Sequence, residues 1–79
     1  MNTTSKDILQ DLKERHKKST LKKDELAKEL NMSVSSINRY ISLGYGIPNY
    51  IKVGDGKNSR VLFPLVDVAN FLSQTTKTL

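Results

Sequence analysis

Two short segments with helical periodicity, residues 23–30 and 34–42, are separated by only three residues, so the chain must form a closely joined helix pair. At about 100° per residue, apolar side chains share one side of each helix: Leu26, Ala27 and Leu30, then Val34, Ile37, Tyr40 and Ile41. Asn31 tolerates a left-handed backbone, and Ser33 is a favourable N-cap. The sequence therefore predicts two short helices joined by a tight turn, with Gly44 as the stop signal of the second.

The outer side of the second predicted helix is polar but almost uncharged, which is unusual for a solvated helix. It consists of Ser35, Ser36, Asn38, Arg39 and Ser42. Side chains that enter the major groove of DNA must be short or able to donate and accept hydrogen bonds. With Ala27 as the point of close approach and Ile37 as the residue that locks the pair, this pattern favours a helix-turn-helix that reads DNA.

Further elements are predicted on both sides of this pair. A first helix begins with Ser5 as its N-cap and runs to about Lys18, with an apolar stripe made of Ile8, Leu9 and Leu12. Two β-prone runs, 50–53 and 60–63, flank a turn that contains Asp-Gly, which predicts a two-stranded hairpin. Pro64 fits the first turn of a last helix that ends near Gln74.

Composition excludes several classes of protein. A chain of 79 residues holds one domain or less, and the absence of cysteine removes disulfide frameworks and thiolate metal sites. No run approaches the roughly 20 apolar residues of a membrane span. One histidine and scattered carboxylates make a catalytic centre hard to assemble, so we expect no enzyme, cofactor or metal. The net charge of +5 suits an anionic partner, and the expected location is the cytoplasm, associated with the nucleoid.

Residues 21–72 resemble the excisionase-type winged helix-turn-helix family of small phage and mobile-element regulators, which is similar to the DNA-binding heads of the MerR family. The matching positions are Asp24-Glu25-Leu26-Ala27, Leu30, Ser33-Val34-Ser35, Ile37-Asn38-Arg39-Tyr40-Ile41, Gly44, Ile47-Pro48 and Asp67-Val68-Ala69-Asn70-Phe71-Leu72. The resemblance implies a recognition helix in the major groove and a β-hairpin wing over the adjacent backbone or minor groove. The chain departs from the family at Lys22 and Val66, where capping residues are common, and at Phe71, where Trp is common.

The expected fold is therefore mainly α with a small β-hairpin: a winged helix-turn-helix preceded by an extra N-terminal helix. Its expected parts are a basic N-terminal helix or arm (1–20), the winged domain (21–74) and a flexible tail (75–79). The expected DNA-binding residues are Ser33, Ser35, Ser36, Asn38, Arg39 and Ser42 in the recognition helix, and Lys52, Lys57, Asn58 and Arg60 in or near the wing.

The expected function is sequence-specific binding to double-stranded DNA, as a transcription regulator or an excisionase-like factor. The alternative is a protein-interaction module that acts on an integrase, a polymerase or a replication protein. Because one module of this size covers little DNA, we expect several copies to act together. The stripe of Ile8, Leu9 and Leu12 is a candidate contact between copies.

Several residues have more than one interpretation from sequence. Arg39 either contacts a base or pairs on the surface with Glu25 or Glu29. Asn38 suits adenine and a phosphate equally well. Tyr40 and Tyr50 are expected at the edge of the core, His16 is expected to be structural or exposed, and a set of basic residues is expected either to contact phosphates or to be solvated: Arg15, Lys17, Lys18, Lys22 and Lys23.

Overall fold

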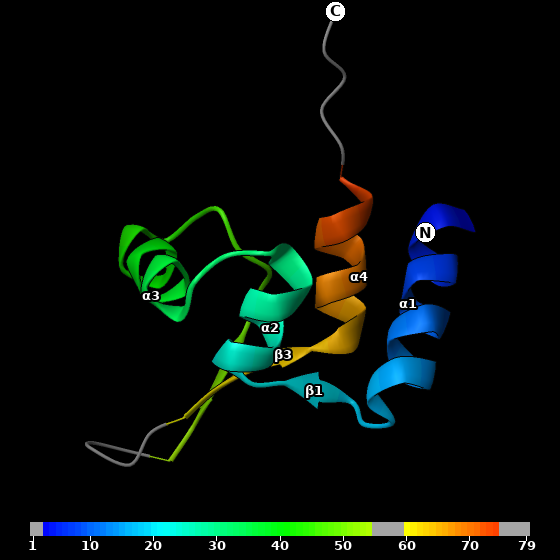
Figure 1. Cartoon of the computed structure of the whole chain (residues 1–79), viewed down its shortest axis with the longest axis horizontal. Coiled ribbons are helices and arrows are strands. Elements are labelled where there is room, and N and C mark those ends of the chain that lie inside the picture. The colour runs from blue at the N-terminus through cyan, green and yellow to red at the C-terminus, as the bar shows by residue number, and fades with distance from the viewer. Residues whose placement is uncertain (1–2, 55–59, 75–79) are drawn as a thin grey trace, which may run out of the picture.

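The computed structural model describes residues 3–54 and 60–74. Its elements are α1 (Thr3–His16), β1 (Thr20–Leu21), α2 (Lys23–Leu30), α3 (Val34–Leu43), β2 (Ile51–Val53), β3 (Arg60–Pro64) and α4 (Leu65–Ser73) (Figure 1). The fold is mainly α with a small antiparallel sheet, and it has the arrangement of a winged helix-turn-helix preceded by an extra helix. This confirms the fold class predicted from the sequence. The predicted tail, 75–79, lies outside the described residues.

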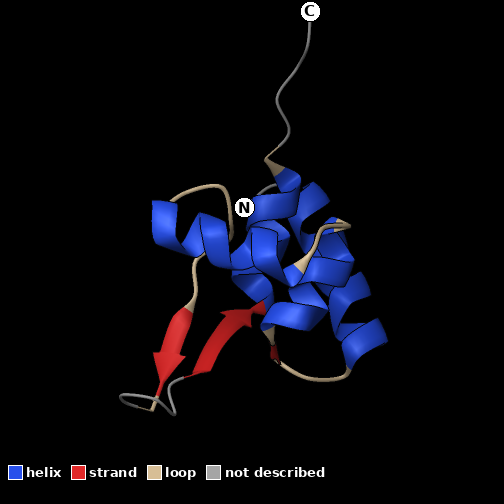
Figure 2. Cartoon of the chain, turned by 60° about the vertical axis from the view of Figure 1, so that its left-hand side comes forward, coloured by secondary structure: helices blue, strands red, loops and turns tan. Residues whose placement is uncertain are grey.

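The sheet has three strands, one more than predicted, in the order β1-β3-β2 (Figure 2). The central strand β3 pairs antiparallel with β2, where Ile51 lies opposite Leu62, and with β1, where Leu21 lies opposite Phe63. The predicted hairpin is therefore confirmed in β2 and β3, and β1 is an additional strand that the sequence analysis did not predict. The strand β1 is only two residues long, which is too short to show the alternating pattern by which strands are recognised.

All four helices contribute to a single hydrophobic core. Its buried members are Leu12, Leu21, Leu26, Ala27, Ile37, Phe63, Leu65, Val68 and Ala69. The first helix lies alongside the last one, so α1 and α4 close one side of the molecule together (Figure 1). Leu12 of α1 is buried in the same core as residues of the helix-turn-helix, so α1 packs against them.

The apolar stripe of α1 packs within the chain. Leu12 is fully buried, and Ile8 and Leu9 are partly buried against the same core. A fully buried side chain is not available to a second molecule, so the part of the prediction that assigned Leu12 to a contact between copies is corrected. Self-association of the chain stays a prediction.

The ends of α1 differ from those predicted. The helix already begins at Thr3, so Ser5 lies inside it rather than at its N-cap. The Ser5 hydroxyl donates a hydrogen bond of 2.7 Å to Oδ1 of Asn70 on α4, and Ser5 is buried in this contact. The helix ends at His16, and Lys17 then takes a left-handed conformation with φ of 56°. Sequence alone could not distinguish a capping serine from one that serves the contact between α1 and α4.

The turn between α2 and α3 has the predicted chemistry. Asn31 is left-handed, with φ of 55° and ψ of 49°. The hydroxyl oxygen of Ser33 accepts the backbone N–H of Ser36 at 3.1 Å, which caps α3. Ile37 is fully buried and anchors α3 to the core. The predictions for Asn31, Ser33 and Ile37 are therefore confirmed, as is that for Gly44, which ends α3 in the left-handed region with φ of 81°.

The helix α2 lacks a capping serine or threonine and is capped in another way. The carboxylate of Glu25 accepts the backbone N–H of Lys22 at 2.9 Å, as the third residue of a capping box does. The same carboxylate also pairs with Lys18, which precedes β1. Glu25 thus compensates for the absence of a capping hydroxyl at Lys22 and ties the segment between α1 and β1 to α2.

The loop after α3 contains two glycines that allow a direct prediction about stability. Both Gly44 and Gly46 have positive φ, but only at Gly46 would an added Cβ meet a neighbour, the ring of Tyr40 at 2.8 Å. Gly44→Ala should cost about 1–2 kcal/mol for the left-handed backbone alone. Gly46→Ala should cost about 1–3 kcal/mol more, because the tyrosine ring must move. Urea unfolding of the two variants checks this order, and equal losses would contradict it.

Candidate nucleic-acid interface

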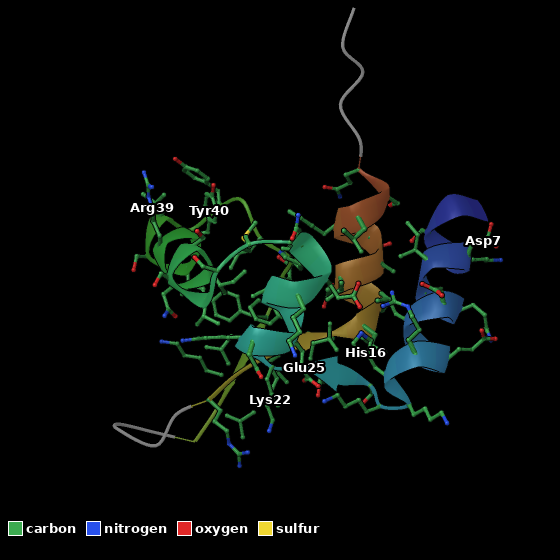
Figure 3. All side chains as sticks on the ribbon, viewed as in Figure 1. Asp7, His16, Lys22, Glu25, Arg39 and Tyr40 are labelled. Carbon is green, nitrogen blue, oxygen red and sulfur yellow. The ribbon has the colours of Figure 1, made fainter. Side chains whose placement is uncertain are left out.

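The outer side of α3 presents a continuous polar stripe. Its members are exposed and carry no acid: Ser35, Asn38, Arg39 and Ser42. They lie within an arc of about 100° on the helix, opposite the buried Ile37. α3 is the outermost helix on its side of the molecule, and no described segment covers the stripe (Figure 1). The side chain of Arg39 points away from the body of the chain (Figure 3).

Within the described part of the chain, Arg39 has neither an ion pair nor a hydrogen bond. The carboxylates that were its alternative partners are already used. Glu25 pairs with Lys18, and Glu29 contacts Arg15 and His16. The guanidinium is therefore held in water at the surface, with its donors available to an acceptor on another molecule.

Asn38 is oriented by a residue of the other helix of the pair. The ammonium of Lys23, at the start of α2, donates a hydrogen bond of 2.7 Å to Oδ1 of Asn38. The two residues are 15 positions apart, and no local pattern in the sequence indicates this contact. With its oxygen bonded to Lys23, the exposed amide of Asn38 offers its NH₂ group to the surroundings.

Ser33 and Ser36 form the cap of α3. Ser33 is exposed, whereas Ser36 is half-buried, and their hydroxyl oxygens lie 3.1 Å apart. The structure thus places Ser36 beside the N-terminal turn and off the exposed stripe to which the sequence assigned it. Ser33 remains at the surface, close to the backbone amides that begin α3.

The two described basic residues of the wing lie on opposite faces of the hairpin. Arg60 is directly opposite Val53 in the ladder, and Lys52 is opposite Val61. Because facing residues share a face and successive residues alternate, Lys52 and Arg60 point to different sides. Both are exposed. Lys57 and Asn58, which were predicted to complete the wing contact, lie outside the described residues.

A basic hollow of about 260 Å³ lies where β1 ends and α2 begins, beside the central strand. Its lining residues are Lys22, Lys23, Asp24, Arg60, Val61 and Leu62. Three of these residues are basic and one is acidic. The hollow links the wing to α3, because Lys23 also holds Asn38. The sequence analysis named Lys22 and Lys23 among the basic residues that either contact phosphates or are solvated, and gave no sign that Arg60 lies beside them.

The basic residues at the end of α1 are largely engaged within the chain. Arg15 contacts Asp11 at 2.9 Å and Glu29 at 2.5 Å, and His16 contacts Glu29 at 2.7 Å. Together with the pair of Lys18 and Glu25, these contacts fasten α1 to α2. Arg15 and Lys18, which the sequence suggested as phosphate contacts, thus have acidic partners. His16 was expected to be structural or exposed, and its contact with Glu29 is structural.

This network lowers the pKa of two carboxyl groups. The hydrogen bond from Arg15 holds the pKa of Glu29 below its ordinary value, and His16 acts in the same direction. The hydrogen bond from Lys18, reinforced by the backbone N–H of Lys22, likewise lowers the pKa of Glu25. Both groups therefore favour the folded state when they are ionised.

The network predicts a loss of stability in acid. Because the pKa of Glu29 is lower in the folded chain than in the unfolded one, its contribution is complete above the ordinary pKa and disappears as pH falls through the folded value. Glu29→Gln should therefore reduce the drop in urea midpoint between about pH 7 and about pH 3. Glu14→Gln is the matched control, because Glu14 is exposed and, among the described residues, accepts a hydrogen bond only from Gln10. An undiminished drop in Glu29→Gln would contradict the assignment.

Comparisons with protein families, curated proteins and solved structures find no match for this chain. None of the described helices is long and apolar enough to cross a membrane. Within residues 3–54 and 60–74, no group of three or more histidine and acidic side chains is placed to hold a metal ion.

Proposed function

We propose that the chain binds double-stranded DNA in a sequence-specific manner, with α3 in the major groove. The observation that carries this proposal is the exposed, acid-free stripe of α3, in which the guanidinium of Arg39 has no partner among the described residues. Arginine is the commonest reader of a guanine edge, and serine hydroxyls donate and accept hydrogen bonds with any base. A helix side that faces only water usually carries several charged side chains. This stripe carries one, that of Arg39.

The basic hollow supports a second part of the proposal, a contact with the DNA backbone. Lys22, Lys23 and Arg60 bring positive charge to the same side of the molecule from α2 and β3. Such contacts fix the register of a protein on the duplex and carry no sequence information themselves. We assign the hollow to a phosphate next to the groove that α3 enters, and Ser33 to a second phosphate near the start of α3.

The resemblance to excisionase-type proteins supports the biological part of the proposal. In that role the chain is a transcription regulator or an excisionase-like factor of a phage or another mobile element, and it acts on the nucleoid. A single copy of this size buries only about 600–1,000 Å² on DNA, so several copies would occupy neighbouring sites.

Selection of bound sequences from a random pool of duplex DNA tests the proposal directly. We expect one enriched motif, with affinity that falls linearly with salt on a logarithmic scale. Recovery of motifs at regular spacing would also support the action of several copies. An unenriched pool at moderate salt would contradict sequence-specific binding, and a pull-down that resists nuclease would then favour the protein-interaction alternative.

A further inference from the structure

We propose that Lys23 is a positioning residue that determines which base α3 prefers. It does so by fixing the amide of Asn38 as a hydrogen-bond donor toward the DNA. This inference rests on the proposed function, because it assigns a base preference to one position of the same interface. Lys23 itself reads no base in this proposal and acts through Asn38.

The chemistry of the contact fixes the orientation of the amide. A lysine ammonium carries three N–H donors and no acceptor. Only the oxygen of the Asn38 amide can therefore lie 2.7 Å from Nζ of Lys23, and the NH₂ group must take the other position. A flipped amide would direct N–H groups at the ammonium and lose the bond.

Lys23 is held in place for this task. Lys23 is half-buried, whereas Lys22, which precedes α2, and Lys28 within α2 are exposed. Within the described residues it pairs with no carboxylate, so no salt bridge competes with Asn38 for the ammonium. Its two remaining N–H groups are available to the phosphate that we assign to the hollow, and DNA binding would then strengthen the position of Lys23.

The fixed amide favours guanine over adenine at the base pair that Asn38 faces. Adenine presents an acceptor and a donor in the major groove, so bidentate recognition by asparagine needs both its oxygen and its NH₂ group. Guanine presents two acceptors, N7 and O6, which two N–H donors can satisfy. The ammonium of Lys23 occupies one of the two lone pairs of Oδ1 and weakens this oxygen as an acceptor for the amino group of adenine, whereas the NH₂ group keeps both of its donors for guanine.

The test is the same DNA selection carried out with the full chain and its variants Lys23→Met, Lys22→Met and Asn38→Ala. Lys22→Met is the matched control, because it removes an equal charge from the neighbouring position of the hollow and leaves the amide in place. Both lysine variants should lose affinity similarly for all sequences. Only Lys23→Met should also shift one position of the motif from guanine toward adenine, by about tenfold in relative affinity.

The double variant Lys23→Met/Asn38→Ala separates positioning from other roles. The shift should vanish in the Asn38→Ala background, because no amide remains to be turned. Without DNA, the side-chain NH₂ resonances of Asn38 should move in Lys23→Met and stay in place in Lys22→Met. A motif unchanged by Lys23→Met would overturn the inference and leave the proposed function intact. Failure of the original chain to select any motif would overturn both.

Discussion

Replacement of Leu12 by alanine is expected to destabilise the chain by about 2–5 kcal/mol, the range found for buried leucines in protein cores. Leu12 is 0% exposed and comes from the first helix, yet it packs in the core that also holds Ile37 of α3. Small domains have total stabilities of only about 5–15 kcal/mol, so the loss takes a large share of the total. Urea unfolding followed by circular dichroism measures this loss of stability.

Leu12→Asp should prevent folding altogether, because it buries a charge with no partner.

Leu43→Ala is the matched control for this loss. Leu43 is also a helical leucine, but it is 48% exposed at the end of α3. Its truncation should change the free energy of unfolding by about 0.5 kcal/mol or less, as surface substitutions usually do. If Leu12→Ala were as mild as Leu43→Ala, α1 would be an appendage, and the assignment of α1 to the core would be wrong.

Replacement of Arg39 by alanine should have the largest effect on DNA binding, about 1–3 kcal/mol, and should relax base preference at one position. The guanidinium is exposed and has no acidic partner among the described residues, so its removal breaks no internal contact. The free energy of unfolding should therefore stay nearly constant while affinity falls. A binding titration on a panel of site variants, combined with thermal unfolding, measures both quantities.

Lys28→Ala controls for the loss of charge. Lys28 is exposed on α2 and has no partner among the salt bridges of the described residues. It lies outside the stripe of α3, so its removal should weaken binding slightly and equally for all sequences. An Arg39→Ala variant that behaves like Lys28→Ala would show that Arg39 contributes only charge.

The helix-turn-helix could be predicted in detail because each of its requirements is local. Asn31 supplies the left-handed turn, Ser33 caps the second helix and Ile37 fills the core, and each of these roles depends on residue type and spacing alone. The division of α3 into an apolar and a polar side follows directly from helical geometry. The exposed stripe was therefore predictable except for Ser36, which the cap draws to one side.

The errors concern contacts between segments far apart in the chain. The role of Ser5 depends on Asn70, and strand β1 forms only because β3 pairs with it. The narrow stripe of α1 gave no indication of whether α4 or another molecule would cover it. The same limit applies to charge, since the basic residues near the end of α1 looked available until the structure showed Glu25 and Glu29 beside them.

The pairing of the first and last helices has a consequence for how the chain acquires its shape during synthesis. Ser5 and its partner Asn70 are separated by 65 positions, and β1 waits for β3 in the same way. Local helices form quickly, but contacts between distant segments must await the emergence of both from the ribosome. The core should therefore close only after β3 and α4 have emerged from the ribosome, and a nascent chain that stalls before α4 would expose apolar surface to chaperones and proteases.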